Sequence, residues 1–235
     1  MACRPISHHE YKAESIPDIW ECRYFVSGSK ERPDGYEHDD LKDSGEFFHR
    51  WDGPRRDDDV YFISDEIFVN VKLRESKESE PTIKLRVCLD AYKGFQLWHT
   101  EFVERLPAPA EVWKQVLEQL KIKIGDDNEK QLSTSSQASE VERILCRAVP
   151  KPLCKQAVKL RWRYIGPLGE VEVAEVAVAS IPPRSEDIAS PPLYSVSFES
   201  KSTDTTGIRK IRDALKADRL GTPESYVQWL THWPK

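Results

Sequence analysis

Apolar and charged positions alternate along several short stretches of the chain, and this period of two predicts strands. Residues 70–76 (NVKLRES) and 82–87 (TIKLRV) have this pattern, and residues 157–166 (AVKLRWRYIG) repeat it in the second half. Each strand would have one apolar face and one cationic face. The cationic positions are Lys72, Arg74, Lys84, Arg86, Lys159, Arg161 and Arg163.

The remaining pattern predicts one domain spanning 1–235, built from two similar halves. In the first half, about 19–122, strands are expected at 19–26, 59–62 and 69–76, a hairpin at 82–105 and a helix near 107–120. Residues 27–56 are expected to form a long loop, and polar, Ser-rich 123–138 a linker. The second half, about 139–235, repeats the plan, with strands at 157–166, 170–178 and 193–200. Helices are expected at 139–149 and 205–218, and a last one at 222–233 with Thr222 as N-cap and Pro223 at its first position.

Composition excludes several classes of protein. The 235 residues carry a formal net charge of −5, so no global field would attract bulk nucleic acid or an anionic membrane. No apolar run approaches the roughly 20 residues needed to span a bilayer, and the first residues are polar where a signal peptide is apolar. The five cysteines lack C-x-x-C spacing, so neither a disulfide framework nor a structural zinc site is indicated. A reducing, cytoplasmic location is expected.

The cationic faces have two interpretations. Most alternating strands simply present their charged face to solvent. Here, however, cations recur on strands far apart in sequence, and Glu170, Glu172 and Glu199 alternate with the same period on others. Antiparallel strands that close into a barrel would gather these side chains inside, with the apolar faces outward beneath helices. Cations with a few carboxylates suit a polyphosphate with a divalent metal ion.

Several short motifs resemble those of the CYTH, or triphosphate tunnel metalloenzyme, superfamily. The residues are DVYF (59–62) followed by VNVKLRE (69–75) and TIKLRV (82–87), then VKLRWRY (158–164) and EVEVAEV (170–176). The resemblance covers most of the chain from about Ile19. It implies an α+β fold with an eight-stranded antiparallel barrel forming a tunnel, helices outside, and hydrolysis of inorganic or organic triphosphates with Mg²⁺ or Mn²⁺.

The resemblance also implies roles for individual residues. The seven cations of the strand pattern would bind phosphates, and the family's E-x-E-x-K strand matches IWECR (19–23), so that Glu21 and Arg23 would be catalytic. The implied metal ligands are Glu21, Glu170, Glu172 and Glu199. Ile19 stands where the family has its first acid, and Arg23 where it has Lys. The cationic part is therefore complete, whereas the metal site lacks one carboxylate, which places catalysis in doubt.

Weaker patterns offer other chemistry. HHE (8–10) and RRDDD (55–59) have metal-binding residue types, but such runs in polar segments are usually solvated. His99 and Glu101 share a strand face and are expected to hydrogen-bond rather than act as an acid–base couple. No P-loop, G-x-G-x-x-G, H-E-x-x-H or G-x-S-x-G is present, which argues against the mechanisms that use these motifs.

Three functions remain open. The first is a metal-dependent phosphohydrolase acting on a triphosphate-bearing small molecule. The second is a non-catalytic protein of the same fold that binds a nucleotide or polyphosphate and reports it to a protein partner. The third is an open sheet used as a protein-interaction module, with its charged faces in solvent. Closure of the sheet distinguishes the third function from the other two.

Overall fold

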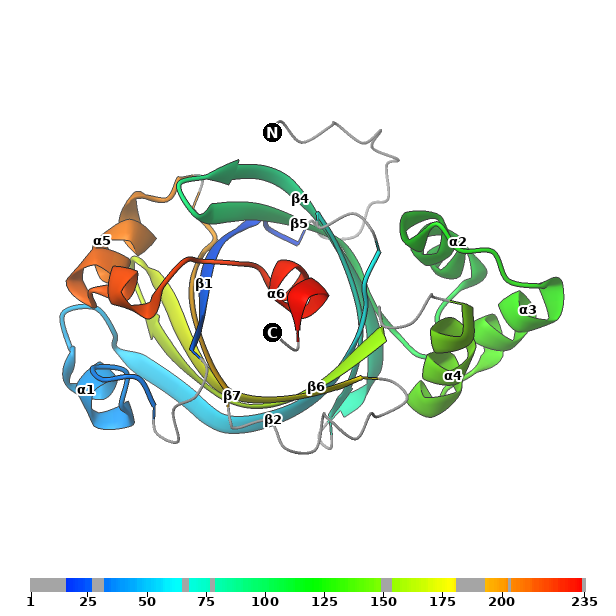
Figure 1. Cartoon of the computed structure of the whole chain (residues 1–235), viewed down its shortest axis with the longest axis horizontal. Coiled ribbons are helices and arrows are strands. Elements are labelled where there is room, and N and C mark those ends of the chain that lie inside the picture. Colours follow the sequence, from blue (N-terminus) through cyan, green and yellow to red (C-terminus); the bar gives the residue numbers. More distant parts are fainter. Residues whose placement is uncertain are drawn as a thin grey trace.

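Eight antiparallel strands close into a ring in the computed structural model of the chain (Figure 1). The structure describes residues 16–26, 32–64, 68–76, 79–148, 154–180, 193–202 and 204–233. The order around the ring is β1-β5-β4-β3-β2-β6-β7-β8, and β1 pairs with both β5 and β8, which closes it. The expected closed antiparallel sheet is confirmed, and the open sheet of the third hypothesis is wrong.

The strands divide unequally between the two halves of the chain. Among the residues that the structure describes, the first half contributes five strands and the second half three, so the expected similarity of the halves does not extend to strand number there. The strands are β1 (Ile19–Val26), β2 (Arg50–Phe62), β3 (Val69–Ser76), β4 (Ser79–Tyr92), β5 (Phe95–Arg105), β6 (Cys154–Gly166), β7 (Gly169–Ser180) and β8 (Leu193–Ser200).

Two groups of helices cover the ring from outside (Figure 1). On one side lie α2 (Ala110–Leu120), α3 (Asp126–Thr134) and α4 (Ala138–Ala148), and on the other α1 (His38–Asp43), α5 (Thr206–Ala214) and the 3₁₀ helix η2 (Ala217–Leu220). The apolar positions of β3 and β4, such as Val71 and Leu85, pack with Trp113 and Leu145 of the first group in one buried cluster. The apolar faces therefore point outward, as the pattern predicts.

The short helix α6 (Tyr226–His232) lies at the centre of the ring when the molecule is viewed as in Figure 1. Its Tyr226, Val227, Trp229 and Leu230 are buried in one cluster with Tyr61 and with apolar residues of β6, β7 and β8. The Tyr226 ring stacks on the Tyr61 ring with centroids 5.5 Å apart. The C-terminal helix thus fills part of the space that the ring encloses.

Four expected elements are corrected by the structure. The expected linker at 123–138 contains α3 and the start of α4, because Leu132 and Ala138 are buried in the cluster of Trp113. The expected loop at 27–56 contains α1 and the first residues of β2, which begins at Arg50 rather than near residue 59. The N-cap of the last helix is Ser225, whose hydroxyl accepts from the Gln228 amide in a capping box, and not Thr222.

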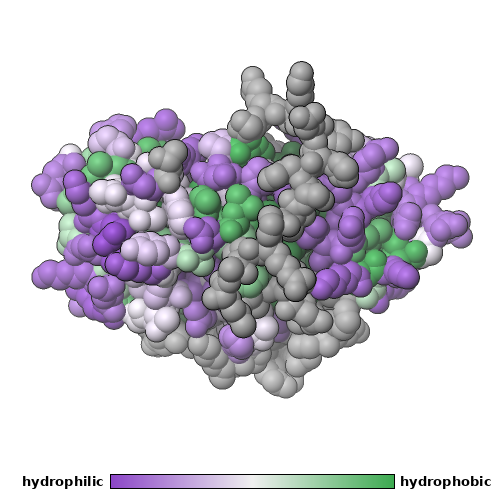
Figure 2. Space-filling model, turned by 90° about the horizontal axis from the view of Figure 1, so that it is seen from above, coloured by the Kyte–Doolittle hydropathy of each residue, from purple (hydrophilic) through white to green (hydrophobic). Residues whose placement is uncertain are grey.

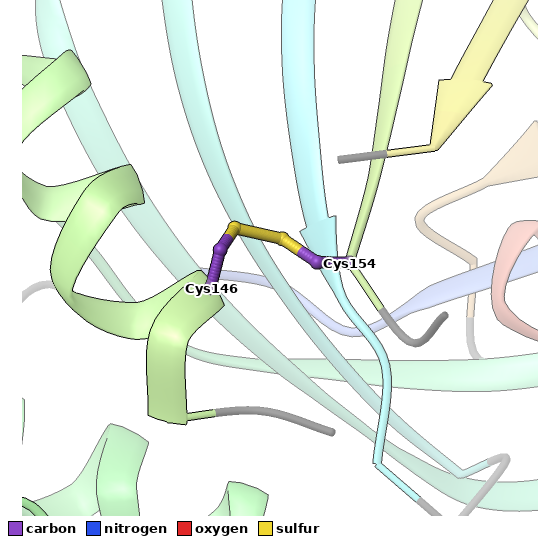
Figure 3. Close-up of a disulfide and its surroundings, with 2 residues drawn as sticks. All are labelled: Cys146 and Cys154. Atoms are coloured by element: carbon purple, nitrogen blue, oxygen red, sulfur yellow. A yellow bond between two sulfur atoms is a disulfide. The ribbon is translucent and has the colours of Figure 1, made fainter. Parts of the chain in front are cut away.

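A disulfide joins Cys146 of α4 to Cys154 at the start of β6 (Figure 3). The expectation that the cysteines form no disulfide is therefore wrong for this pair, whose spacing of eight residues carries no recognisable motif. Cys22 and Cys88 are buried and take part in no disulfide. The bond links the group of helices α2, α3 and α4 to β6, the strand that carries Lys159 and Arg161.

Hydrophilic residues dominate both helical flanks of the face shown in Figure 2, and apolar residues appear in its middle. The large apolar side chains exposed on β4 and β5 are Leu89, Tyr92 and Val103. None of the helices in the described ranges is long and apolar enough to cross a bilayer.

Candidate anion-binding site inside the barrel

The strand alternation that sends apolar residues outward sends charged residues into the barrel. Lys72 and Lys84 pair across β3 and β4, and Arg163 pairs with Glu172 across β6 and β7. The Nζ atom of Lys159 lies 3.8 Å from the centroid of the Tyr226 ring at the centre of the barrel. The structure therefore brings the sequence-derived cations together on the inner wall, where all of them except Lys84 contact carboxylates.

A first set of these contacts surrounds Asp59, a residue of β2 whose side chain is fully buried. Arg74 Nε lies 2.7 Å from Asp59 Oδ1, and the Nζ atoms of Lys159 and Lys72 lie 2.8 Å and 3.2 Å from Oδ2. Burial alone would raise the pKa of Asp59, but Lys159, Lys72 and Arg74 hold it well below its ordinary value. Asp59 therefore stays ionised and neutralises part of the cationic wall.

Asp57 extends this cluster two residues earlier on the same strand face. It is also fully buried, and its Oδ2 lies 2.6 Å from Arg161 Nε and 3.3 Å from Arg74 Nη1. Arg55 Nε donates to its Oδ1 at 3.1 Å. The sequence interpretation of residues 55–59 as a solvated run is therefore wrong for Asp57 and Asp59, which are interior groups of the site.

The second set centres on Arg23 of β1, which lies among three carboxylates. Its Nε lies 2.9 Å from Glu21, its Nη1 3.3 Å from Glu172 and its Nη2 3.3 Å from Glu199. Burial opposes ionisation of Glu21, but Arg23 and Arg86 lower its pKa to about 2. Burial also opposes ionisation of Glu172, whose pKa the neighbouring arginines nevertheless lower. These two acids are ionised partners of guanidinium groups.

The four glutamates expected to bind a metal ion are thus held by cations of the chain itself. Three of them contact Arg23, and Glu170 contacts Arg163 at 2.5 Å. Within the described ranges, no group of three or more His, Cys, Asp or Glu side chains is arranged to hold a metal ion. The donor set does not fit Mg²⁺ or Mn²⁺, because the carboxylate oxygens converge on a guanidinium.

The inner face of β4 differs from both sets, since it holds cations without matching acceptors. Lys84 has no ion-pair or hydrogen-bond partner in the part of the chain that the structure describes. Burial, with Arg86 and Arg74 nearby, lowers its pKa to about 8. Arg86 donates through Nη1 to Glu21, but its buried Nε and Nη2 have no acceptor among the described residues, and the buried Thr100 hydroxyl also lacks a partner. These groups form an unfilled set of donors.

Two cavities border the charged interior. One of about 440 Å³ is lined by Ile19, Glu170 and Glu199 together with the β6–β7 turn. Another, of about 210 Å³, is lined by Glu21, Arg23, the β4–β5 turn and the residues that lead into α6. Ile19 pairs with Trp98 and shares a strand face with Glu21, and as an apolar residue it adds no carboxylate to this face.

Other candidate residues lie outside this site. His99 does not pair with Glu101, because its Nδ1 lies 2.6 Å from Asp18 Oδ1 at a partly exposed position. The HHE run at 8–10 lies outside the described residues.

Glu199 makes a pH-dependent contribution to stability that a single substitution tests. Burial, with Glu21 and Glu172 nearby, raises its pKa to about 7. The contribution of Glu199 to the free energy of unfolding is complete below its pKa in the unfolded chain, near 4.5. It is lost as the pH rises through the folded pKa of about 7. Glu199→Gln is therefore expected to stabilise the protein at pH 8, by up to about 3 kcal/mol, and to change little near pH 5. Urea unfolding at both pH values measures this difference in stability.

Glu175→Gln, on the exposed outer face of β7, is the matched control for Glu199→Gln. A Glu199→Gln variant that is less stable than wild type at pH 8 would contradict the assignment of a raised pKa to Glu199.

Comparisons with known proteins add two distant structural likenesses. No family model matches the chain, and no curated protein matches its sequence. A chain of the Schizosaccharomyces pombe Mediator head module is 9% identical, with a TM-score of 0.44, over 85% of this chain and 95% of that chain. The S. pombe Pct1 RNA triphosphatase is 9% identical, with a TM-score of 0.29, over 88% of this chain and 79% of that chain. At these values neither likeness assigns a family or a function.

Proposed function

We propose that the interior of the barrel binds a small molecule bearing a polyphosphate chain, and that the protein acts by binding rather than by hydrolysis. The observation that carries this proposal is the unfilled donor set on the inner face of β4 and β5, formed by Lys84 and two guanidinium nitrogens of Arg86 on β4 and by the hydroxyl of Thr100 on β5. Buried donors without acceptors are costly, and a bound phosphate supplies several acceptor oxygens at once.

The neighbouring cations extend this donor set along the inner wall. Arg74 and Lys72 lie beside it on β3, and both carry N–H groups beyond those that contact Asp57 and Asp59. A chain of phosphate groups could contact cations on both strands, whereas a single phosphate would reach fewer of them. The ligand class is therefore an inorganic or organic triphosphate rather than a monophosphate. The net charge of −5 favours a small ligand over bulk nucleic acid.

Metal-dependent hydrolysis has weaker support than binding. That reaction needs a metal-activated water and charge neutralisation on the leaving phosphate. The carboxylates that would hold the ion instead contact Arg23 and Arg163. A metal-dependent triphosphatase, the leading hypothesis from the sequence, therefore becomes the alternative. A protein partner that senses the bound ligand remains part of the proposal.

Calorimetric titration with tripolyphosphate, pyrophosphate and phosphate, in the presence of EDTA, tests the binding. Affinity is expected to fall in that order. A hundredfold excess of tripolyphosphate over its dissociation constant would stabilise the native state by about 2.7 kcal/mol. Arg56→Ser is the matched control, because Arg56 lies on the outer face of β2 and should not affect affinity. Absence of binding by all three anions, both in EDTA and when Mg²⁺ or Mn²⁺ is added instead, would refute the proposal.

Phosphate release from a panel of triphosphates with Mg²⁺ or Mn²⁺ separates the two functions. We expect no release above background. Sustained turnover that Glu21→Gln abolishes would establish the hydrolase instead.

A further inference from the structure

Three carboxylates from three neighbouring strands converge on one guanidinium. Glu21 belongs to β1, Glu199 to β8 and Glu172 to β7, and these strands are adjacent in the ring. Each carboxylate takes a different nitrogen of Arg23, at 2.9 Å, 3.3 Å and 3.3 Å. Converging carboxylate oxygens are what a hard divalent ion binds, so this cluster has the donor chemistry of a metal site with an arginine at its centre.

The cluster is also balanced in charge without any added ion. Arg86 contacts Glu21 at 3.2 Å, and Arg161 contacts Glu172 at 2.9 Å. Three guanidinium groups therefore accompany three carboxylate groups at positions that are less than one-fifth exposed. A divalent ion would enter a region that already holds three permanent positive charges, and each carboxylate would have to give up a guanidinium contact.

Arg23 is fixed in this position from several sides. Its side chain is 5% exposed, and its Nη1 also donates to the Ser195 hydroxyl at 3.2 Å. The Tyr226 ring of α6 covers the guanidinium at 4.5 Å, and the Tyr226 hydroxyl lies 3.1 Å from the same Ser195 oxygen. A guanidinium with this many simultaneous contacts is held in one orientation. A lysine, with a single nitrogen, could not reach three carboxylates and a hydroxyl from this position in the same way.

We propose that Arg23 occupies the place of a divalent cation among Glu21, Glu172 and Glu199. The wild-type protein consequently does not bind Mg²⁺ or Mn²⁺ at this cluster, and removal of the guanidinium opens a divalent-cation site there. A corollary, which rests on the proposed function, is that polyphosphate binding needs no metal.

The decisive experiment compares Mn²⁺ binding by wild type and by Arg23→Gln. Electron paramagnetic resonance detects free Mn²⁺, and thermal unfolding with and without millimolar Mn²⁺ reports binding to the native state. Wild type is expected to leave Mn²⁺ free and its Tm unchanged. Arg23→Gln, less stable than wild type in EDTA because three carboxylates have lost their shared partner, is expected to bind one Mn²⁺ and to regain stability with it.

Two further variants locate the site. Arg23→Gln combined with Glu172→Gln should lose the Mn²⁺ binding, because one ligand of the opened site is gone. Arg23→Lys keeps a positive charge among the carboxylates and should not gain the binding. Gain of Mn²⁺ binding in Arg23→Gln that persists when Glu172 is replaced would show that the ion binds elsewhere, and would overturn the proposal.

The wild-type measurement decides the question even if Arg23→Gln does not fold. One Mn²⁺ bound per wild-type chain and lost in Glu21→Gln would overturn the proposal, as would a folded Arg23→Gln variant that leaves Mn²⁺ free. The proposal on function fails separately, when wild type binds no polyphosphate. If wild type binds tripolyphosphate only when Mg²⁺ or Mn²⁺ is present, the function stands and the assignment of Arg23 is wrong.

Discussion

Asp59→Ala is expected to destabilise the protein by about 3 to 5 kcal/mol, the range for a buried ion pair that loses one partner. Asp59 is fully buried and contacts Arg74, Lys159 and Lys72, so its removal leaves three cations crowded in the interior without their shared anion. Urea unfolding at pH 7 measures the loss. The low pKa of Asp59 predicts the same loss in acid: its contribution is present above the unfolded pKa, near 3.8, and disappears as the pH falls through the folded value.

Asp58→Ala is the matched control for this substitution. Asp58 is the preceding residue on β2, but its side chain is 38% exposed and its partner Arg56 is 61% exposed. An exposed ion pair of this kind contributes between zero and about 1 kcal/mol. Comparable losses from Asp58→Ala and Asp59→Ala would contradict the assignment of Asp59 to the interior of the barrel.

Strand periodicity predicts the inward cations because each alternating stretch has a clear apolar face. Val71 and Leu73 mark the outer face of β3, so Lys72 and Arg74 must lie on the other. The same argument fails for residues 55–59, where five charged residues in succession hide the period. The start of β2 and the two interior aspartates were missed for this reason. The signal that could have found them is the continuation of the strand backward from Val60, which puts Asp57 and Asp59 on the face of Tyr61.

Other features of the site depend on how separate strands and helices are placed against one another, which the residue pattern of a single strand does not show. Glu172 and Glu199 meet Arg23 because of the register of β7, β8 and β1, and a shift of one residue would turn each of them outward. The apolar face of α6 predicts burial but does not tell whether the helix packs outside the ring or inside it. The bond between Cys146 and Cys154 likewise depends on how α4 approaches β6.

Lys84→Met is expected to abolish most of the tripolyphosphate binding while leaving the protein at least as stable as wild type. Lys84 is the one sequence-derived cation that has no anionic partner within the described part of the chain. Replacing Lys84 therefore leaves no carboxylate without a partner. Replacing Arg74 or Arg161 would do so, because both contact buried aspartates. Burying an unpaired ammonium is costly, so the methionine variant should unfold at the same or a higher urea concentration.

The pH dependence of binding follows from the pKa of about 8 that burial, with Arg86 and Arg74, gives Lys84. A bound phosphate would favour the ammonium form, so free protein takes up a proton on binding once the pH exceeds 8. Affinity for tripolyphosphate should then fall, approaching about tenfold for each pH unit. Lys84→Met should lose this component of the dependence, and the difference between the two proteins removes the ionisation of the ligand itself. Lys114→Met, on the exposed face of α2, is the matched control and should behave as wild type. Undiminished affinity in Lys84→Met, with the pH dependence unchanged, would show that the inner face of β4 does not bind the anion.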